Sequence, residues 1–145
     1  MTRIAFSRIR SGWPLALAAA LLVPAFAVPP VAGAQELAAG DAVAGAKVFR
    51  KCQACHLVDV EKNKVGPHLV DIVGRPVAAL EDYQYSTAMT EYAQTQPEWT
   101  EEALAAYLRK PRDVVPKTKM AFAGLKKDED LANIIAYLKD PSAAE

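Results

Sequence analysis

The sequence is poor in the residues that build zinc sites and disulfide frameworks. Its 145 residues include two cysteines and two histidines, and a structural zinc site normally needs four ligands. Beyond the cluster of Cys52, Cys55 and His56, only His68 remains to complete such a site. A dithiol oxidoreductase would place its cysteine pair beside a βαβ pattern, and no strand-rich segment is apparent. Both classes of protein are therefore disfavoured.

A basic excess is also missing. The full sequence has 17 Lys and Arg residues against 17 Asp and Glu residues. Its first 34 residues contain Arg3, Arg8 and Arg10 and no acidic residue, so residues 35–145 have 14 basic and 17 acidic side chains, a formal charge of −3. Nucleic-acid-binding domains normally have a strong basic excess. The composition therefore predicts no nucleic-acid partner.

The apolar run near the N-terminus is too short to span a bilayer. It covers residues 13–28, which is 16 residues, whereas a transmembrane helix needs about 20. Basic residues precede this run and the small residues 32–34 follow it, so the pattern predicts a secretory signal peptide, residues 1–34, cleaved before Gln35. We expect residues 35–145 to form the mature periplasmic domain, in an oxidising compartment. The alternative is an uncleaved leader that tethers the protein to the membrane.

Five consecutive residues, Cys52-Gln53-Ala54-Cys55-His56, hold the reactive groups of the chain. This pattern is typical of c-type haem attachment. Each thiol can add across a haem vinyl group to form a thioether, and the histidine that follows is held under the iron as an axial ligand. The motif therefore predicts one covalently attached haem c, bound through Cys52 and Cys55, with His56 on the iron.

The mature part is predicted to be a small all-α domain. Capping residues and apolar periodicity indicate four helices. The first helix follows an N-cap at Asp41 and carries the cysteine motif at its end, and the second runs from a cap at Ser86 to about Tyr92. The third helix follows Thr100 and stops at Pro111. The last helix is capped by Asp128 and ends at Pro141. About 110 residues must also enclose a large planar ligand, so the haem should form much of the core. We expect the apoprotein to be poorly folded.

The residue pattern alone leaves the second axial ligand open. That face of the iron needs a soft neutral donor or a nitrogen, and the candidates are Met120, Met89, His68 and nearby lysines. A lone methionine is usually core filler. Met120 is less suited to that role, because it lies in a polar loop bounded by Pro116 and Gly124.

Several ordered segments resemble the class I cytochromes c of the mitochondrial and bacterial c2 type. They are Gly40-Asp41, Gly45, Phe49, the cysteine motif, Gly66-Pro67, Gly74-Arg75, Trp99, Pro-Lys-Thr-Lys-Met-Ala-Phe-Ala-Gly at 116–124 and Ile-Ala-Tyr-Leu-Lys from Ile135. These matches cover nearly all of residues 35–145. The resemblance implies the class I cytochrome c fold, in which three main helices, short helices and loops wrap around one haem.

The resemblance also assigns roles around the iron. Met120 matches the methionine ligand of the family, opposite His56. The Pro67 carbonyl would accept the ring N–H of His56 and fix its tautomer. Tyr107 would hydrogen-bond near the Met120 sulfur. His/Met ligation raises the reduction potential.

Further contacts are implied at the haem periphery and between the terminal helices. Arg75, Tyr85 and Trp99 would neutralise or hydrogen-bond the propionates, whose burial would otherwise be costly. Thr118 and Phe122 resemble positions near the other propionate and the exposed haem edge. The crossing of the terminal helices is matched by Gly45, Phe49, Ile134 and Tyr137.

Three positions depart from the family pattern. His68 replaces the asparagine that usually follows Gly-Pro, and we expect a surface or packing role for it rather than ligation. Met89 replaces a polar residue beside the distal haem pocket. Lys117 replaces the glycine of the methionine loop, so a positive φ there would carry strain.

The resemblance implies a one-electron carrier without substrate chemistry of its own, acting as a monomer. Its donor would be a membrane cytochrome bc-type complex, and its acceptor an oxidase, a peroxidase or a photosynthetic reaction centre. Exposed basic residues would steer acidic partners to the haem edge. These are Lys117, Lys119, Lys126 and Lys127, with Arg50 and Lys51. An alternative is a haem peroxidase or ligand sensor in which Met120 dissociates from the iron.

Overall fold

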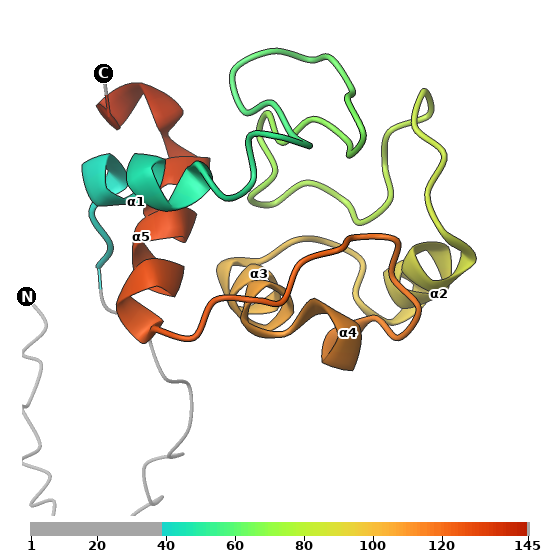
Figure 1. The fold of residues 1–145 in the computed structure, drawn as a ribbon. Coiled ribbons are helices and arrows are strands. Elements are labelled where there is room, and N and C mark those ends of the chain that lie inside the picture. The colour runs from blue at the N-terminus through green and yellow to red at the C-terminus, as the bar shows by residue number, and fades with distance from the viewer. Residues whose placement is uncertain (1–38, 145) are drawn as a thin grey trace, which may run out of the picture. The chain divides into compact units, whose positions relative to one another are not determined.

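A computed structural model describes residues 39–144 of the chain. The predicted signal peptide and its cleavage site lie outside the described residues. The elements within the described part are helices joined by long loops (Figure 1). They are α1 (Ala42–Phe49), α2 (Thr87–Thr95), α3 (Glu101–Arg109), α4 (Pro111–Val114), α5 (Asp128–Lys139) and a 3₁₀ helix, η1 (Pro141–Ala144). Across residues 39–144 the β-structure is limited to one isolated bridge between Pro76 and Glu98, so the predicted all-α class is confirmed.

Three helices begin at the capping residues that the sequence predicted. The Asp41 carboxylate accepts a hydrogen bond from Ala44 N at 2.8 Å at the start of α1. Ser86 and Thr100 do the same for α2 and α3, each accepting from the backbone N–H three residues ahead at 3.1 Å. Each cap satisfies one of the backbone donors that a helix N-terminus leaves free.

Other helix boundaries differ from the prediction. Asp128 does not cap α5, because Lys127 occupies the N-cap position and Asp128 is the first helical residue. Its carboxylate instead pairs with Arg109 at the end of α3. Helix α2 continues past Tyr92 to Thr95. Pro111 follows the end of α3 but also begins α4, since the fixed φ of proline suits the first position of a helix.

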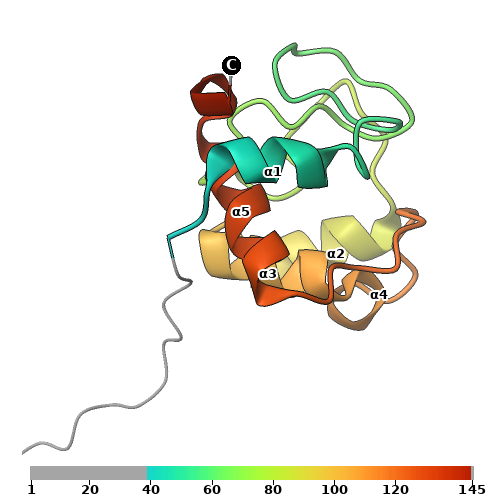
Figure 2. The same cartoon turned by 60° about the vertical axis from the view of Figure 1, so that its left-hand side comes forward.

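The terminal helices α1 and α5 cross each other (Figures 1 and 2), and Gly45 of α1 lies against α5 at this crossing. A Cβ atom on Gly45 would overlap the carbonyl of Asn133 and lie 2.6 Å from Cβ of Tyr137. The Phe49 and Tyr137 rings pack beside this crossing, with centroids 5.4 Å apart, and Ile134 is fully buried. The predicted crossing is therefore confirmed, and its close approach depends on the missing side chain of Gly45.

One contact at this crossing was not predicted. Asn133 on α5 is buried, and its side-chain oxygen accepts a hydrogen bond from Asp41 N at 2.8 Å. The residue that caps α1 is thereby fixed to α5. Leu131, Ile134 and Ile135 on the same helix are among the most buried side chains of the core.

Among the described helices, none combines the length and apolar character needed to cross a membrane.

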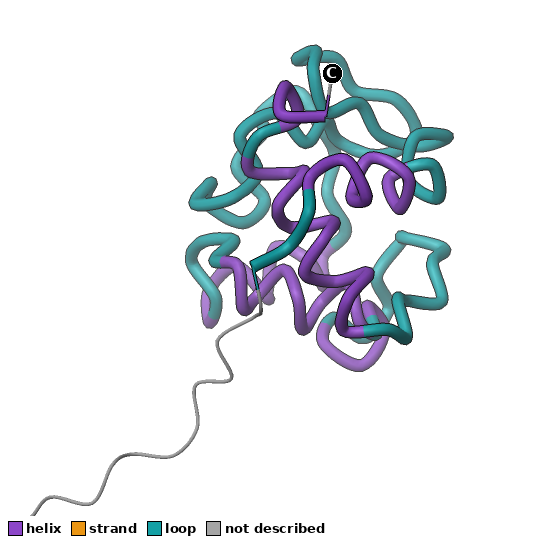
Figure 3. Tube along the Cα trace, turned by 90° about the vertical axis from the view of Figure 1, so that its left-hand side faces the viewer, coloured by secondary structure: helices purple, strands orange, loops and turns teal. Residues whose placement is uncertain are grey.

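The chain between α1 and α2 runs as irregular loops, drawn in teal in Figure 3. These loops are tied to the segment before α3 by backbone hydrogen bonds. Gly74 N donates to Trp99 O at 2.8 Å, and Trp99 N donates to Arg75 O at 2.9 Å. This pairing brings residues 24 and 25 positions apart in the sequence into contact and fixes Arg75 beside the buried Trp99.

Candidate haem-binding site

The cysteine motif lies in a series of turns directly after α1. Cys52 N donates to Phe49 O at 2.7 Å, and the N–H groups of Cys55 and His56 both donate to Cys52 O at 3.0 Å. Both thiols are free and half-buried. Burial raises the pKa of the Cys52 thiol, with the nearby Lys51 acting against this rise. Two free thiols and an imidazole are thus held together within one compact turn.

The imidazole of His56 is fixed from two sides. Its Nδ1 lies 2.7 Å from the Pro67 carbonyl oxygen. Because a carbonyl only accepts, Nδ1 carries the proton and the lone pair of Nε2 is left for a metal ion. Gly66 packs against the ring, where a Cβ atom would overlap Cε1 and lie 2.7 Å from Nδ1. The predicted hydrogen bond to Pro67 is present. Position 66 requires glycine because any side chain there would collide with the His56 ring.

The environment of His56 favours the neutral imidazole. Burial lowers its pKa, and the positive charge of Lys64 lowers it further, while the hydrogen bond to Pro67 opposes both. A neutral imidazole is the form that binds a metal. Lys64 also donates from Nζ to the carbonyl oxygen of Gln53 at 2.6 Å, which ties the following loop to the cysteine motif. This contact could not be predicted from the sequence, because an isolated lysine in a polar loop is typical of solvent-exposed positions.

Met120 lies in the irregular segment between α4 and α5, and its side chain is half-buried. Its backbone N–H donates to Thr118 Oγ1 at 3.3 Å, and that hydroxyl is 3.0 Å from the Tyr107 hydroxyl. In this way Tyr107 is linked to the methionine loop through Thr118, and its expected hydrogen bond near the Met120 sulfur stays a prediction. The segment returns to α3 at Gly124, where a Cβ atom would overlap the Arg109 carbonyl. Ligation of iron by Met120 stays a prediction.

A second group of predicted residues gathers around Arg75. Its guanidinium donates to the carbonyl oxygens of Val70 and His68, each at 2.9 Å. Burial lowers the pKa of Arg75, whereas Tyr85 and Asp71 act to raise it. Burial likewise raises the pKa of Tyr85, and the Arg75 charge acts against that rise. Arg75 and Tyr85 are thus close enough to influence each other, and their role at a haem propionate stays a prediction.

Trp99 and Tyr107 form part of a row of aromatic rings. The Trp99 ring centroid is 5.1 Å from that of Tyr107 and 5.8 Å from that of Tyr92. Both Trp99 and Tyr107 are buried, whereas Phe122 is half-buried. Burial raises the pKa of Tyr107, with its bond to Thr118 acting against the rise. This row connects the Arg75 group to the methionine loop and was not predicted, because its members come from three separate segments.

The three departures have structural consequences. His68 is 7% exposed and packs in the interior, so of the two roles expected for it the packing role is correct. Lys117 has φ of +68°, which confirms the expected left-handed strain. Met89 lies in the first turn of α2 and packs against the core.

The residues present fit a c-type haem. Free thiols three positions apart can form two thioethers, and the adjacent imidazole has its Nε2 available as an iron ligand. Arg75 and Tyr85 form a polar group suited to a propionate. This combination of donors matches haem rather than a bare metal ion. Among residues 39–144, no three His, Cys, Asp or Glu side chains are grouped to hold a metal ion.

Comparisons with known proteins agree with this chemistry. The cytochrome c family model matches residues 42–141. Cytochrome c2 of Afifella marina is 50% identical over 102 residues, which are 69% of this chain and 82% of that protein. The cytochrome c-type cyt cy of Rhodobacter capsulatus is 50% identical over 100 residues, which are 68% of this chain and 48% of that protein. This chain therefore spans about half the length of the Rhodobacter protein.

A solved structure shows the same fold. Cytochrome cH from Methylobacterium extorquens superposes with a TM-score of 0.63 at 39% identity, and the match covers 69% of this chain and 98% of that one. Proteins of this family carry covalently bound haem c and serve as electron carriers, generally without enzymatic activity. The family match, the relatives and the attachment motif together show that the chain belongs to the cytochrome c family, as a class I member of the c2 type with one covalently bound haem c.

Proposed function

We propose that the protein is a periplasmic one-electron carrier whose haem iron is held between His56 and Met120. The observation that carries this proposal is the fixed His56 ring, with Nδ1 bonded to Pro67 O at 2.7 Å and one face covered by Gly66. A ligand held in this way needs little rearrangement when the charge of the protein changes by one electron. The haem supplies the redox couple, and the residues around it adjust the potential and exclude substrates.

Met120 is proposed as the second ligand because its loop is restrained against α3, close to Tyr107. The chain of hydrogen bonds from Met120 N through Thr118 to Tyr107 limits the freedom of this loop. A thioether favours the reduced state and raises the potential relative to harder ligands. With both axial positions filled, small substrates have no open coordination position. This closed site is the physical reason to expect electron transfer without catalysis.

Arg75, Tyr85 and Trp99 are proposed to support one propionate. A carboxylate away from water needs a compensating charge or donor, and the guanidinium of Arg75 already satisfies two carbonyl oxygens while keeping its positive charge. Thr118 and Phe122 are proposed near the other propionate and the exposed haem edge. These contacts would hold the haem in one orientation relative to the attachment turns.

The partners are proposed from charge and exposure. Lys117, Lys119, Lys126 and Lys127 are exposed in and after the methionine loop, whereas Lys51 is engaged with Asp130 at 3.4 Å. Such a basic surface would steer an acidic redox partner to the haem edge, in the small and short-lived type of interface that electron transfer uses. We propose a membrane cytochrome bc-type complex as donor, and an oxidase, a peroxidase or a photosynthetic reaction centre as acceptor.

The axial ligand is tested by the visible spectrum of the ferric holoprotein as pH is varied. We expect an iron–sulfur absorption band that persists through neutral pH and disappears in Met120→Ala. Met89→Leu is a matched control, because Met89 is also half-buried and leucine has a similar volume. The control should keep the band. A high-spin wild type, or a Met120→Ala spectrum that matches wild type, would contradict His/Met ligation.

A peroxidase or ligand-sensing function is the second candidate. The left-handed Lys117, with φ of +68°, favours it because backbone strain in the methionine loop would ease dissociation of Met120. A ferric spectrum that lacks the sulfur band at neutral pH, together with turnover of hydrogen peroxide, would support this function over electron carriage. Intact mass separately tests export, because a retained leader would keep residues 1–34.

A further inference from the structure

The carbonyl group that holds His56 depends on neighbouring residues for its own position. The Pro67 carbonyl oxygen lies 2.7 Å from Nδ1 of His56. Proline has no backbone N–H, so Pro67 cannot itself donate a hydrogen bond that would anchor this carbonyl. Its place must therefore be set by the residues on either side of it in the loop.

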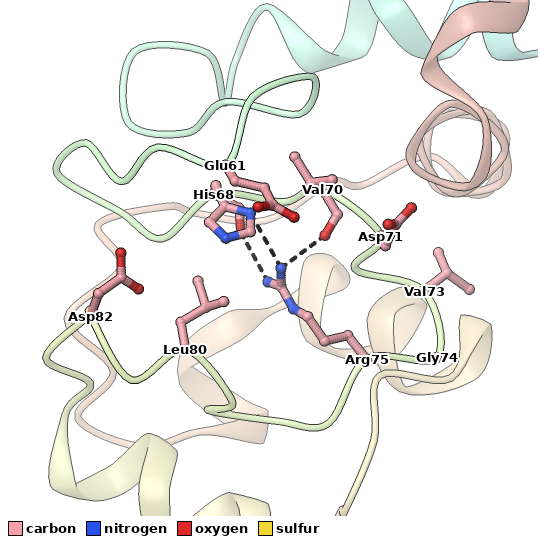
Figure 4. A pocket seen from close by; sticks show the side chains of 9 residues that line it. All are labelled: Glu61, His68, Val70, Asp71, Val73, Gly74, Arg75, Leu80 and Asp82. Carbon is pink, nitrogen blue, oxygen red and sulfur yellow. Dashed lines mark hydrogen bonds between the residues drawn. The ribbon is translucent and has the colours of Figure 1, made fainter.

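The residue after Pro67 is anchored from two directions. The backbone N–H of His68 donates to Asn63 Oδ1 at 2.9 Å. The His68 carbonyl oxygen accepts a hydrogen bond from Nη2 of Arg75 at 2.9 Å (Figure 4). His68 is also buried, so this side of Pro67 is firmly held by the loop before it and the loop after it.

The residues before Pro67 are held to the cysteine motif by two hydrogen bonds. One is a backbone bond, from Gly66 N to Cys55 O at 2.9 Å. The other comes from a side chain, since Lys64 Nζ donates to the carbonyl oxygen of Gln53 at 2.6 Å. A turn in which Lys64 N donates to Gly66 O at 2.9 Å joins these two anchors, so the lysine and the glycine beside Pro67 move together.

We propose that Lys64 is a positioning residue for the axial histidine, because its ammonium group holds the Pro67 carbonyl against the imidazole of His56. This inference rests on the proposed function in taking His56 as an iron ligand. The ammonium is close enough to the imidazole for its positive charge to lower the pKa of His56. The hydrogen bond to Gln53 and this electrostatic influence both place Lys64 beside the ligand.

The effect of Lys64 is on how often the bond between His56 and Pro67 opens. While Nδ1–H donates to the carbonyl, the ring keeps one orientation and one tautomer. Loss of the lysine bond leaves the backbone bond from Gly66 to Cys55 intact, so the ligand stays in place and the loop opens more often. A hydrogen bond of ordinary net strength corresponds to an increase of about fivefold in the open population.

The test is the rate at which the Nδ1 proton of His56 exchanges with solvent, measured by NMR in the reduced holoprotein. This proton exchanges only while its bond to Pro67 is open. Lys64→Met replaces the ammonium by an apolar chain of similar length, and we expect exchange about fivefold faster than in wild type. Lys64→Arg keeps a positively charged donor and should have the wild-type rate.

Lys62→Met is the matched control for the loss of one positive charge. Lys62 is exposed in the same loop, and within residues 39–144 its side chain forms no hydrogen bond or ion pair. Its variant should therefore exchange the His56 proton at the wild-type rate. The backbone amide of Ile134, in the buried face of α5, reports unfolding of the whole domain and should exchange equally in all four proteins.

Three results would overturn the inference. They are a wild-type rate in Lys64→Met, an equal acceleration in Lys62→Met or no recovery in Lys64→Arg. Acceleration at Ile134 to the same extent as at His56 would also overturn it, because Lys64 would then contribute only to overall stability. Failure of the His56/Met120 proposal is detected separately, by the ferric visible spectrum of the wild-type protein.

Discussion

Replacement of Gly66 by alanine tests the way in which the protein holds His56. A methyl group at position 66 would overlap Cε1 of the imidazole and lie 2.7 Å from Nδ1 and 2.8 Å from Nε2. Ordinary contacts with a Cβ atom are 3.4–4 Å, so the ring must move by more than half an ångström. Gly66 N also donates to Cys55 O at 2.9 Å, which prevents the backbone from retreating freely. The imidazole is thus the group that has to shift.

The cost of this shift has two parts. Overpacking of a well-packed site costs about 1–3 kcal/mol. Movement of the ring also weakens the Nδ1–Pro67 bond, and loss of a hydrogen bond in a buried site costs about 1–3 kcal/mol. The two terms partly overlap, so we expect the free energy of unfolding of the holoprotein to fall by about 3 kcal/mol. For a domain of this size that corresponds to a decrease in Tm of about 12–24 °C.

The assay is thermal unfolding of the holoprotein, combined with its ferric visible spectrum. Gly66→Ala should lower Tm by the stated amount and alter the bands that report axial ligation, because the ligand itself is displaced. Gly74→Ala is a suitable control, since Gly74 has a positive φ of 81° but no atom within 4 Å of a built Cβ. It should lower Tm through backbone strain and leave the spectrum unchanged. A Gly66→Ala protein with wild-type Tm and spectrum would refute the packing argument.

Two further predictions concern the helix crossing and the methionine loop. Gly45→Ala should lower the free energy of unfolding by about 2 kcal/mol or more, because overlap with Asn133 O and Tyr137 outweighs the gain of about 1 kcal/mol in helix propensity. Denaturant unfolding checks this prediction, and a stabilised variant would contradict a close crossing. Lys117→Gly should raise the free energy of unfolding by about 0.5–1 kcal/mol, because release of left-handed strain of about 1–2 kcal/mol exceeds the entropic cost of glycine. An unchanged midpoint in the same assay would show that Lys117 carries no strain.

The sequence predicted the features that depend on neighbouring residues. The Cys-x-x-Cys-His spacing places the thiols and imidazole in one turn wherever the rest of the chain lies, and the caps at Asp41, Ser86 and Thr100 act on backbone groups three residues ahead. The boundaries that were wrong involve competition between local signals. Lys127 rather than Asp128 took the cap position of α5, and the Asp128 carboxylate was drawn to Arg109 on another helix.

Resemblance to a family supplied the longer-range expectations, and their outcome depended on the nature of the contact. The crossing at Gly45 and the bond from His56 to Pro67 are present, because both follow from backbone geometry that the fold preserves. Tyr107 is bonded to Thr118, a partner that was not expected, since a side-chain hydroxyl can choose among several nearby acceptors.

By itself, the sequence determined the haem chemistry, the helical class and the approximate helix positions, because each of these is set by residues within a few positions of one another. Only the tertiary structure decided which distant residues meet. The Asn133 side chain holds Asp41 from 92 positions away, Gly66 covers a face of the His56 ring, and a histidine that could have been at the surface is buried against Arg75. Such contacts arise when the loops close around the core, and no local pattern of residues specifies which loop closes on which.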